Sequence, residues 1–125
     1  MNSNFTNILR IILGIGLIVF GLNKFIQFMP LPDLSAHAAN FMNSLRNTGY
    51  MLQIVGLMEI LIGICLLVKR WVPFALLLLA PISVNILMFH LFLDLPGIVG
   101  ALIVFVINGI LIYKYWRTYR PLFQV

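Results

Sequence analysis

The sequence predicts an all-α membrane protein: an antiparallel bundle of four transmembrane helices with a short amphipathic helix between the first and the second. Three observations support this prediction. Hydrophobic residues make up 62% of the 125 residues and charged residues only 9%, whereas soluble domains are roughly 25% charged. The hydrophobic residues fall into four stretches that are each long enough to cross a bilayer. Prolines and basic residues separate these stretches. The high hydrophobic and low charged content excludes both a soluble enzyme and a disordered chain.

Each span ends or begins at a residue type that stops or starts a helix. The four spans cover about residues 8–29, 48–68, 72–93 and 98–115. The first ends at Pro30 and Pro32, because proline lacks an N–H donor and restricts the residue before it. Pro73 stands in the first turn of the third span, where proline is tolerated. The turn residues Asp94–Gly97 separate the third span from the fourth.

The connection between the first two spans has the pattern of an amphipathic helix. Its apolar residues recur at helical spacing and are Leu34, Ala38, Phe41, Met42 and Leu45. Asp33 or Ser35 is suited to be its N-cap. We expect this helix to lie along the membrane surface and to cover the bundle. No repeat or linker divides the chain, so residues 1–125 are expected to form one domain.

The net charge of +5 is explained by membrane topology and does not indicate nucleic acid as a partner. Six of the eight basic residues fall on the side shared by both termini, and they are Arg10, Lys69, Arg70, Lys114, Arg117 and Arg120. The positive-inside rule then places both termini in the cytoplasm. The aromatic residues at this boundary, which are Trp71, Tyr113, Tyr115, Trp116 and Tyr119, fit an interfacial belt.

The residues that usually carry redox or metal chemistry are sparse. Cys65 is the single cysteine and cannot form an internal disulfide, so it is interpreted as a small buried apolar residue. A b-type haem requires two facing histidines, but His37 belongs to the amphipathic helix and His90 to the third span. No metal-ligand spacing, phosphate loop or hydrolytic triad is present. These observations predict no metal and no haem, and they disfavour an enzyme.

The polar residues inside the spans are the candidates for function: Asn23, Lys24, Gln53, Glu59, Ser83, Asn85, His90 and Asn108. A charged side chain at the centre of a span costs roughly 2.5–3.5 kcal/mol on insertion scales, so Glu59 must be paired, hydrated or protonated. At about 1.5 Å per residue, Lys24 lies about 7–8 Å and Glu59 about 16 Å inside the outer ends of their spans. A lysine stem covers much of this difference, which predicts an ion pair between Lys24 and Glu59. His90 and Asn85 lie about 5 Å and about 12 Å deep, so these groups converge on the outer half.

Each candidate also has a structural interpretation. The Lys24–Glu59 pair has two interpretations: it serves ligand binding, or it only fixes the register of two helices. His90 fits a hydrogen-bonded boundary residue, Asn85 can satisfy a carbonyl that Pro81 leaves free, and Asn108 fits an interhelical hydrogen bond. Glycines share the faces of Lys24 and Glu59, and we expect them to allow close helix packing: Gly14, Gly21, Gly56 and Gly63.

Several motifs resemble the DoxX-like family of small bacterial membrane proteins. They are Gly21-Leu22-Asn23-Lys24-Phe25, Thr48-Gly49-Tyr50, Gly56 with Glu59, and Leu79-Ala80-Pro81-Ile82-Ser83-Val84-Asn85 through Phe89-His90. The resemblance covers nearly the whole chain. It implies a four-helix fold in a bacterial cytoplasmic membrane. The family takes its name from similarity to a membrane subunit of thiosulfate:quinone oxidoreductase, and related four-helix proteins act as assembly factors.

Residues and resemblance together favour an accessory subunit of a quinone-linked membrane redox system. Its polar pocket would hold a quinone or a lipid headgroup and would be formed by Lys24, Glu59, Asn23, Asn85 and His90. The alternative is an assembly factor whose glycine-lined faces receive the helices of another protein. A proton-coupled carrier ranks third, because no internal repeat supports it. The expected partners are membrane lipids and another membrane or redox protein; self-association is left open.

Overall fold

The computed structural model describes residues 3–26 and 35–124. All regular elements in these ranges are helical: α1 (Ser3–Ile26), α2 (Ala36–Asn47), α3 (Met51–Val68), α4 (Val72–Phe92), η1 (Leu95–Gly97), α5 (Ile98–Lys114), α6 (Trp116–Tyr119) and η2 (Arg120–Phe123). The four predicted spans correspond to α1, α3, α4 and the continuous segment from η1 through α5, and each is long and apolar enough to cross a membrane. The predicted all-α fold, with a short helix between the first two spans, is confirmed.

The first helix begins earlier than the sequence predicted. α1 starts at Ser3 and not near residue 8, because its polar first turns are satisfied within the helix and by neighbours. The hydroxyl of Thr6 donates a hydrogen bond to the carbonyl oxygen of Ser3 at 3.1 Å, and Thr6 is only 1% exposed. The predicted end of this span at Pro30 lies outside the described residues.

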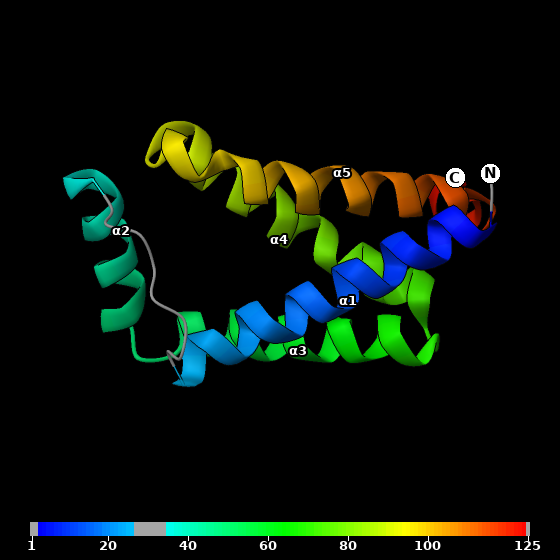
Figure 1. Cartoon of the computed structure of the whole chain (residues 1–125), viewed down its shortest axis with the longest axis horizontal. Coiled ribbons are helices and arrows are strands. Elements are labelled where there is room, and N and C mark those ends of the chain that lie inside the picture. Colours follow the sequence, from blue (N-terminus) through cyan, green and yellow to red (C-terminus); the bar gives the residue numbers. More distant parts are fainter. Residues whose placement is uncertain (1–2, 27–34, 125) are drawn as a thin grey trace.

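The four long helices form two closely packed pairs. α1 runs alongside α3, and α4 runs alongside α5, while contacts of α3 with α4 and of α1 with α5 join the pairs (Figure 1). The start of α1 and the short α6 lie at one end of the bundle, which we call the terminal end. α2 lies across the opposite end, which we call the lid end (Figure 1).

The apolar core occupies the half of the bundle next to the terminal end. It is formed by Leu13, Leu17, Ile62, Leu66, Val72, Ala75, Leu76, Leu79, Ile107 and Leu111. Large apolar side chains on the outer faces are exposed instead, as Phe20 on α1, Ile64 on α3 and Phe105 on α5 illustrate. A surface of this kind fits a hydrocarbon environment, so the fold agrees with a multi-pass membrane protein.

The seam between α1 and α3 depends on two pairs of glycines. A Cβ atom at Gly21 would lie 2.7 Å from the carbonyl oxygen of Gly56, and a Cβ atom at Gly63 would lie 2.7 Å from that of Gly14. Each distance is too short for a real contact. Because the helices are antiparallel, the Gly14–Gly63 and Gly21–Gly56 contacts follow one another along one seam. The predicted glycine packing face is therefore the contact between α1 and α3 of the same chain.

The short helix α2 is the predicted amphipathic helix. Ser35 is its N-cap and accepts a hydrogen bond from the backbone N–H of Ala38, whereas Asp33 lies outside the described residues. The hydroxyl of Ser35 also lies 2.9 Å from the carbonyl oxygen of Leu93, to which it donates. The ring of Phe41 packs 5.6 Å from that of Phe89, measured between centroids. These contacts attach α2 to the end of α4.

The connection between α3 and α4 has an uncommon backbone. Lys69 and Trp71 both have left-handed conformations, with φ of 57° and 55°, which costs an L-residue about 1–2 kcal/mol. Lys69 closes α3 as a left-handed C-cap, and the N–H of Arg70 donates to the carbonyl oxygen of Cys65 at 3.1 Å.

The basic segment after α5 folds back onto the bundle. The sequence indicated a charged, interfacial segment here, but it gave no sign of the contact that holds it. Tyr119 is 3% exposed, and its hydroxyl donates a hydrogen bond to the carbonyl oxygen of Pro73 in the first turn of α4. Burial of the phenol raises the pKa of Tyr119 to about 12.

Candidate functional site

The structure joins Lys24 and Glu59 in an ion pair between α1 and α3. The Nζ atom of Lys24 lies 2.7 Å from the Oε1 atom of Glu59. The two partners differ in accessibility, because the glutamate side chain is 2% exposed and the lysine side chain 24% exposed. Among the described residues, Lys24 is the polar partner of Oε1. A carboxylate oxygen has two lone pairs, so Oε1 can still accept a hydrogen bond from another group.

Local packing explains why the lysine reaches the carboxylate. Gly56 lies one turn before Glu59, and a Cβ atom there would lie 3.2 Å from the Cβ atom of Lys24 and 3.1 Å from the ring of Phe25. A glycine at this position lets the lysine stem run close against α3. The ion pair thus sits at the lid-end side of the glycine seam, where close helix packing shortens the distance the lysine must cover.

The remaining candidates on these two helices differ in burial. Asn23 is 7% exposed, on the position of α1 that precedes Lys24, and it is engaged in a polar interaction. Gln53 is exposed at the lid-end side of α3. Asn23 is therefore a buried polar residue next to Lys24 in the sequence, whereas Gln53 is on the surface.

Asn85 lies apart from the ion pair. It is exposed on α4, and its side-chain amide donates a hydrogen bond to the carbonyl oxygen of Pro81 at 2.9 Å. The acceptor is the carbonyl of the proline itself and not that of Leu77, which loses its regular donor because Pro81 has no N–H. The expectation that Asn85 satisfies the carbonyl left free by Pro81 is therefore wrong, and the side chain instead bonds within its own helix.

His90 takes part in a second polar pair at the lid end. Its Nδ1 atom lies 3.1 Å from the Oδ2 atom of Asp94 and 3.2 Å from the backbone oxygen of Asp94. Gly97 completes this turn, because a Cβ atom there would lie 2.6 Å from Oδ2 of Asp94. His90 is thereby a boundary residue that closes the end of α4, under the attachment point of α2.

A neutral hydrogen-bond network joins α4 and α5. The side-chain amide of Asn108 donates to the carbonyl oxygen of Leu76 at 3.2 Å. The hydroxyl of Ser83 lies 3.1 Å from the amide oxygen of Asn108 and 2.9 Å from the carbonyl oxygen of Ala80. These bonds involve residues on both sides of Pro81. Asn108 on α5 bonds to two residues of α4, as predicted for an interhelical hydrogen-bonding residue.

Two polar contacts at the terminal end are absent from the sequence prediction. Arg10 is 8% exposed, and its guanidinium donates to the carbonyl oxygen of Leu66 in the last turn of α3. A cation is favourable there because the last carbonyls of a helix lack donors and carry partial negative charge. The Nζ atom of Lys114 lies 2.6 Å from the hydroxyl of Thr6. Arg10 shares its helix face with Gly14 and Gly21, and this phase was the available signal for its burial.

Comparisons with known proteins agree with the four-helix structure. The family model DoxX matches residues 5–91, which contain most of α1, all of α2 and α3, most of α4 and the Lys24–Glu59 pair. Neither a curated protein nor a solved structure matches the chain. Among the described residues, no three His, Cys, Asp or Glu side chains are grouped so that they could hold a metal ion.

Proposed function

The chain belongs to the DoxX family of multi-pass membrane proteins, and we propose that it is an accessory subunit of a quinone-linked membrane redox system. In this proposal the Lys24–Glu59 pair holds a quinone or a lipid headgroup. Asn23 is the polar neighbour that shares the site. Asn85 and His90 make local contacts of their own, so they are placed outside it.

The proposal that this pair binds a ligand rests on the unequal accessibility of Lys24 and Glu59. A buried ion pair repays the desolvation of its two charges only when its geometry is good and the remaining hydrogen bonds of both partners are made. Here the carboxylate is enclosed, but the lysine side chain is 24% exposed and Oε1 has capacity to spare. A ligand that approaches from the lysine side can therefore reach the ammonium of Lys24 without separating the helices, while the enclosed carboxylate of Glu59 holds the lysine in place.

The chemistry of the pair fits a ligand with both a hydrogen-bond acceptor and a hydrogen-bond donor. The ammonium of Lys24 can donate to a quinone carbonyl or to a phosphate oxygen. The carboxylate of Glu59 can accept from a quinol hydroxyl or from a headgroup hydroxyl or amine. Because Oε1 of Glu59 is enclosed, a polar head that binds Lys24 reaches the carboxylate only when the lysine side chain moves aside.

The alternative, an assembly factor that receives a partner helix on its glycine faces, is less well supported. Gly14, Gly21 and Gly56 already face the opposite helix of the same chain in the α1–α3 seam. A partner helix cannot use these glycines unless the two helices separate. The ligand site requires no such rearrangement.

Native mass spectrometry of the protein extracted in a mild detergent from its own membrane tests the proposal. We expect Glu59→Gln to carry one quinone- or lipid-sized adduct per chain fewer than wild type, because this substitution removes the negative charge but preserves the shape of the side chain. Gln53→Ala is the matched control, because Gln53 is an exposed polar residue on the same helix. A bare bundle that instead carries a second polypeptide would favour the assembly factor.

A further inference from the structure

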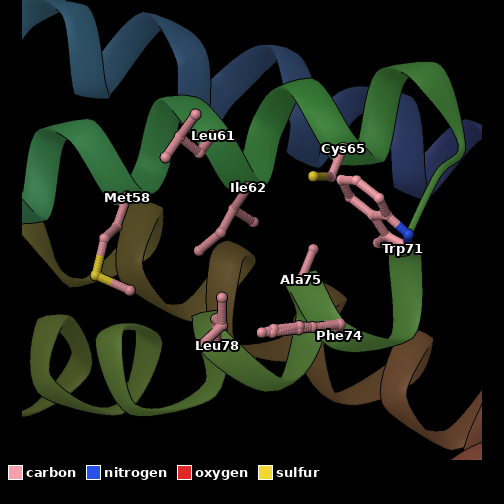
Figure 2. A pocket seen from close by; sticks show the side chains of 8 residues that line it. All are labelled: Met58, Leu61, Ile62, Cys65, Trp71, Phe74, Ala75 and Leu78. Atoms are coloured by element: carbon pink, nitrogen blue, oxygen red, sulfur yellow. The ribbon is translucent and has the colours of Figure 1, made fainter.

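A groove runs along the outer surface between α3 and α4, on the half next to the terminal end. It has a volume of about 400 Å³ and an almost entirely apolar lining. One wall runs from Met58 to Cys65 on α3, and the other runs from Leu78 on α4 back to Trp71, the residue that precedes α4 (Figure 2). At about 1.5 Å per residue, each wall is about 10 Å long. The groove is thus long, narrow and apolar.

Two free cations stand next to the end of this groove. Lys69 and Arg70 follow Cys65 along the chain and precede Trp71, and both are exposed. Their side chains make no ion pair with any residue in the described ranges. Two of the acidic residues, Glu59 and Asp94, are engaged with Lys24 and His90, and the third, Asp33, lies outside those ranges. The positive charge beside the groove is therefore not neutralised by a described side chain.

The backbone of the connection brings an aromatic ring to the same place. Trp71 adopts its left-handed conformation with φ of 55°, and Figure 2 shows its indole beside Cys65, at the end of the groove where α3 and α4 are joined. Tryptophan favours the boundary between hydrocarbon and headgroups. The groove consequently passes from apolar residues to an interfacial ring and then to two cations.

A second apolar groove, between α1 and α5, provides a contrast. It is lined by Leu9, Leu102, Ile103, Val106, Ile107 and Ile110. The cation that follows it on α5 is Lys114, which is already engaged with the hydroxyl of Thr6 at 2.6 Å. Both grooves lie between candidate membrane-spanning helices, but only the α3–α4 groove is adjacent to two cations that are free among the described residues.

We propose that the α3–α4 groove is a binding site for an anionic phospholipid. One acyl chain lies along the apolar groove, and the phosphate lies between the side chains of Lys69 and Arg70, where charge-assisted hydrogen bonds to the guanidinium hold it. Trp71 packs where the chain meets the headgroup. This site is separate from the Lys24–Glu59 pair and does not depend on the function proposed for that pair.

Quenching of Trp71 fluorescence by brominated lipids tests this site. The chain has two tryptophans, so Trp116→Phe leaves Trp71 as the only one. This variant is reconstituted in phosphatidylcholine vesicles that contain a low, equal mole fraction of phosphatidylglycerol or phosphatidylcholine with brominated acyl chains. We expect severalfold stronger quenching by the brominated phosphatidylglycerol. Equal quenching by the two lipids would overturn the proposal, because ordinary surrounding lipid has no such preference.

Three further variants in the Trp116→Phe background test whether the preference for brominated phosphatidylglycerol arises at the α3–α4 groove. Lys69→Gln with Arg70→Gln should abolish it, because the phosphate loses both cations. Leu78→Phe should reduce it, because a larger side chain narrows the groove, whereas Val106→Phe changes the α1–α5 groove and should leave it unchanged. A preference that survives the double Gln variant, or that Leu78→Phe and Val106→Phe reduce equally, overturns the proposal. Circular dichroism confirms that each variant keeps its helical content.

Discussion

At the scale of single residues, several buried polar side chains of this protein are paired with a group on a different helix. Glu59 is matched by a cation from α1, Arg10 by a carbonyl of α3 and Asn108 by a carbonyl of α4. Each contact joins two elements and at the same time removes a polar group from hydrocarbon. Hydrogen bonds of this kind contribute to helix association in a membrane, where the hydrophobic effect between helices is absent.

Tyr119 gives a prediction about pH. Its folded-state pKa of about 12 lies above the value of about 10 for an unfolded chain. Its contribution to stability is therefore complete below pH 10 and is lost as the pH rises through about 12. Below pH 10, Tyr119→Phe should melt at a lower temperature than wild type, since a hydrogen bond worth about 1 kcal/mol is lost. Between pH 10 and pH 12 this difference should shrink.

Thermal melting in detergent at several pH values checks this prediction. Tyr113→Phe is the control, because Tyr113 is 72% exposed, and it should not change the pH dependence. If Tyr119→Phe and wild type lose stability equally between pH 10 and pH 12, burial does not raise the pKa of the Tyr119 phenol, and the prediction is wrong.

Residue-level contacts could be predicted from sequence where two rare groups had to meet. A carboxylate at the middle of a span has few available partners, so depth along the helices was enough to pair Glu59 with Lys24. Asn85 was harder to place, because the sequence gives its phase but not whether that phase faces the bundle. The buried Arg10 was missed, because a basic residue near the end of a span also fits a purely topological role.

At the scale of elements, the α1–α3 seam leaves no room for a Cβ atom at its glycines. Gly21→Ala would place its methyl group 2.7 Å from the carbonyl oxygen of Gly56, a backbone atom that cannot move without moving α3. We expect a loss of about 1–3 kcal/mol of stability from this overpacking. Gly16 on the same helix has nothing within 4 Å of its Cβ position. Gly16→Ala should therefore be neutral, or stabilising by up to about 1 kcal/mol.

Unfolding of both variants in mixed micelles with increasing denaturing detergent measures this difference. Opposite or clearly unequal effects are expected from the same chemical change on one helix. Equal effects of Gly21→Ala and Gly16→Ala would mean that the two helices are not packed as closely in the membrane as the structure has them.

The extent of the elements was well predicted where the sequence contains strong boundaries. Lys69-Arg70, Pro73 and the turn before Ile98 each lie at or next to a helix boundary, and the observed ends of α3, α4 and α5 differ little from those predicted. The start of α1 was predicted too late, because polar residues in its first turns are compatible with a helix once Thr6 is buried. The fold-back of α6 could not be predicted, since it depends on one contact between Tyr119 and Pro73.

At the scale of the whole molecule, the described basic side chains are concentrated at the terminal end, whereas the His90–Asp94 pair and α2 lie at the lid end. We propose that the terminal end faces the cytoplasm, as the positive-inside rule predicts. A Cys65→Ala variant allows a single new cysteine to report on each end. His37→Cys in α2 should react with a membrane-impermeant maleimide in spheroplasts. Gln124→Cys should react only after permeabilisation, and the reverse pattern would contradict this orientation.

The central claim is that the Lys24–Glu59 pair holds a ligand and does not only hold α1 to α3. The double variant Lys24→Met/Glu59→Met separates these roles, because replacing a buried ion pair with apolar side chains of similar size is often neutral or stabilising. Native mass spectrometry is made on this variant beside wild type, together with a melting curve. We predict a bundle at least as stable as wild type that carries one quinone- or lipid-sized adduct fewer than wild type, whereas a phospholipid in the α3–α4 groove is retained. A folded double variant that carries as many adducts as wild type, or a double variant that no longer folds, would contradict the claim.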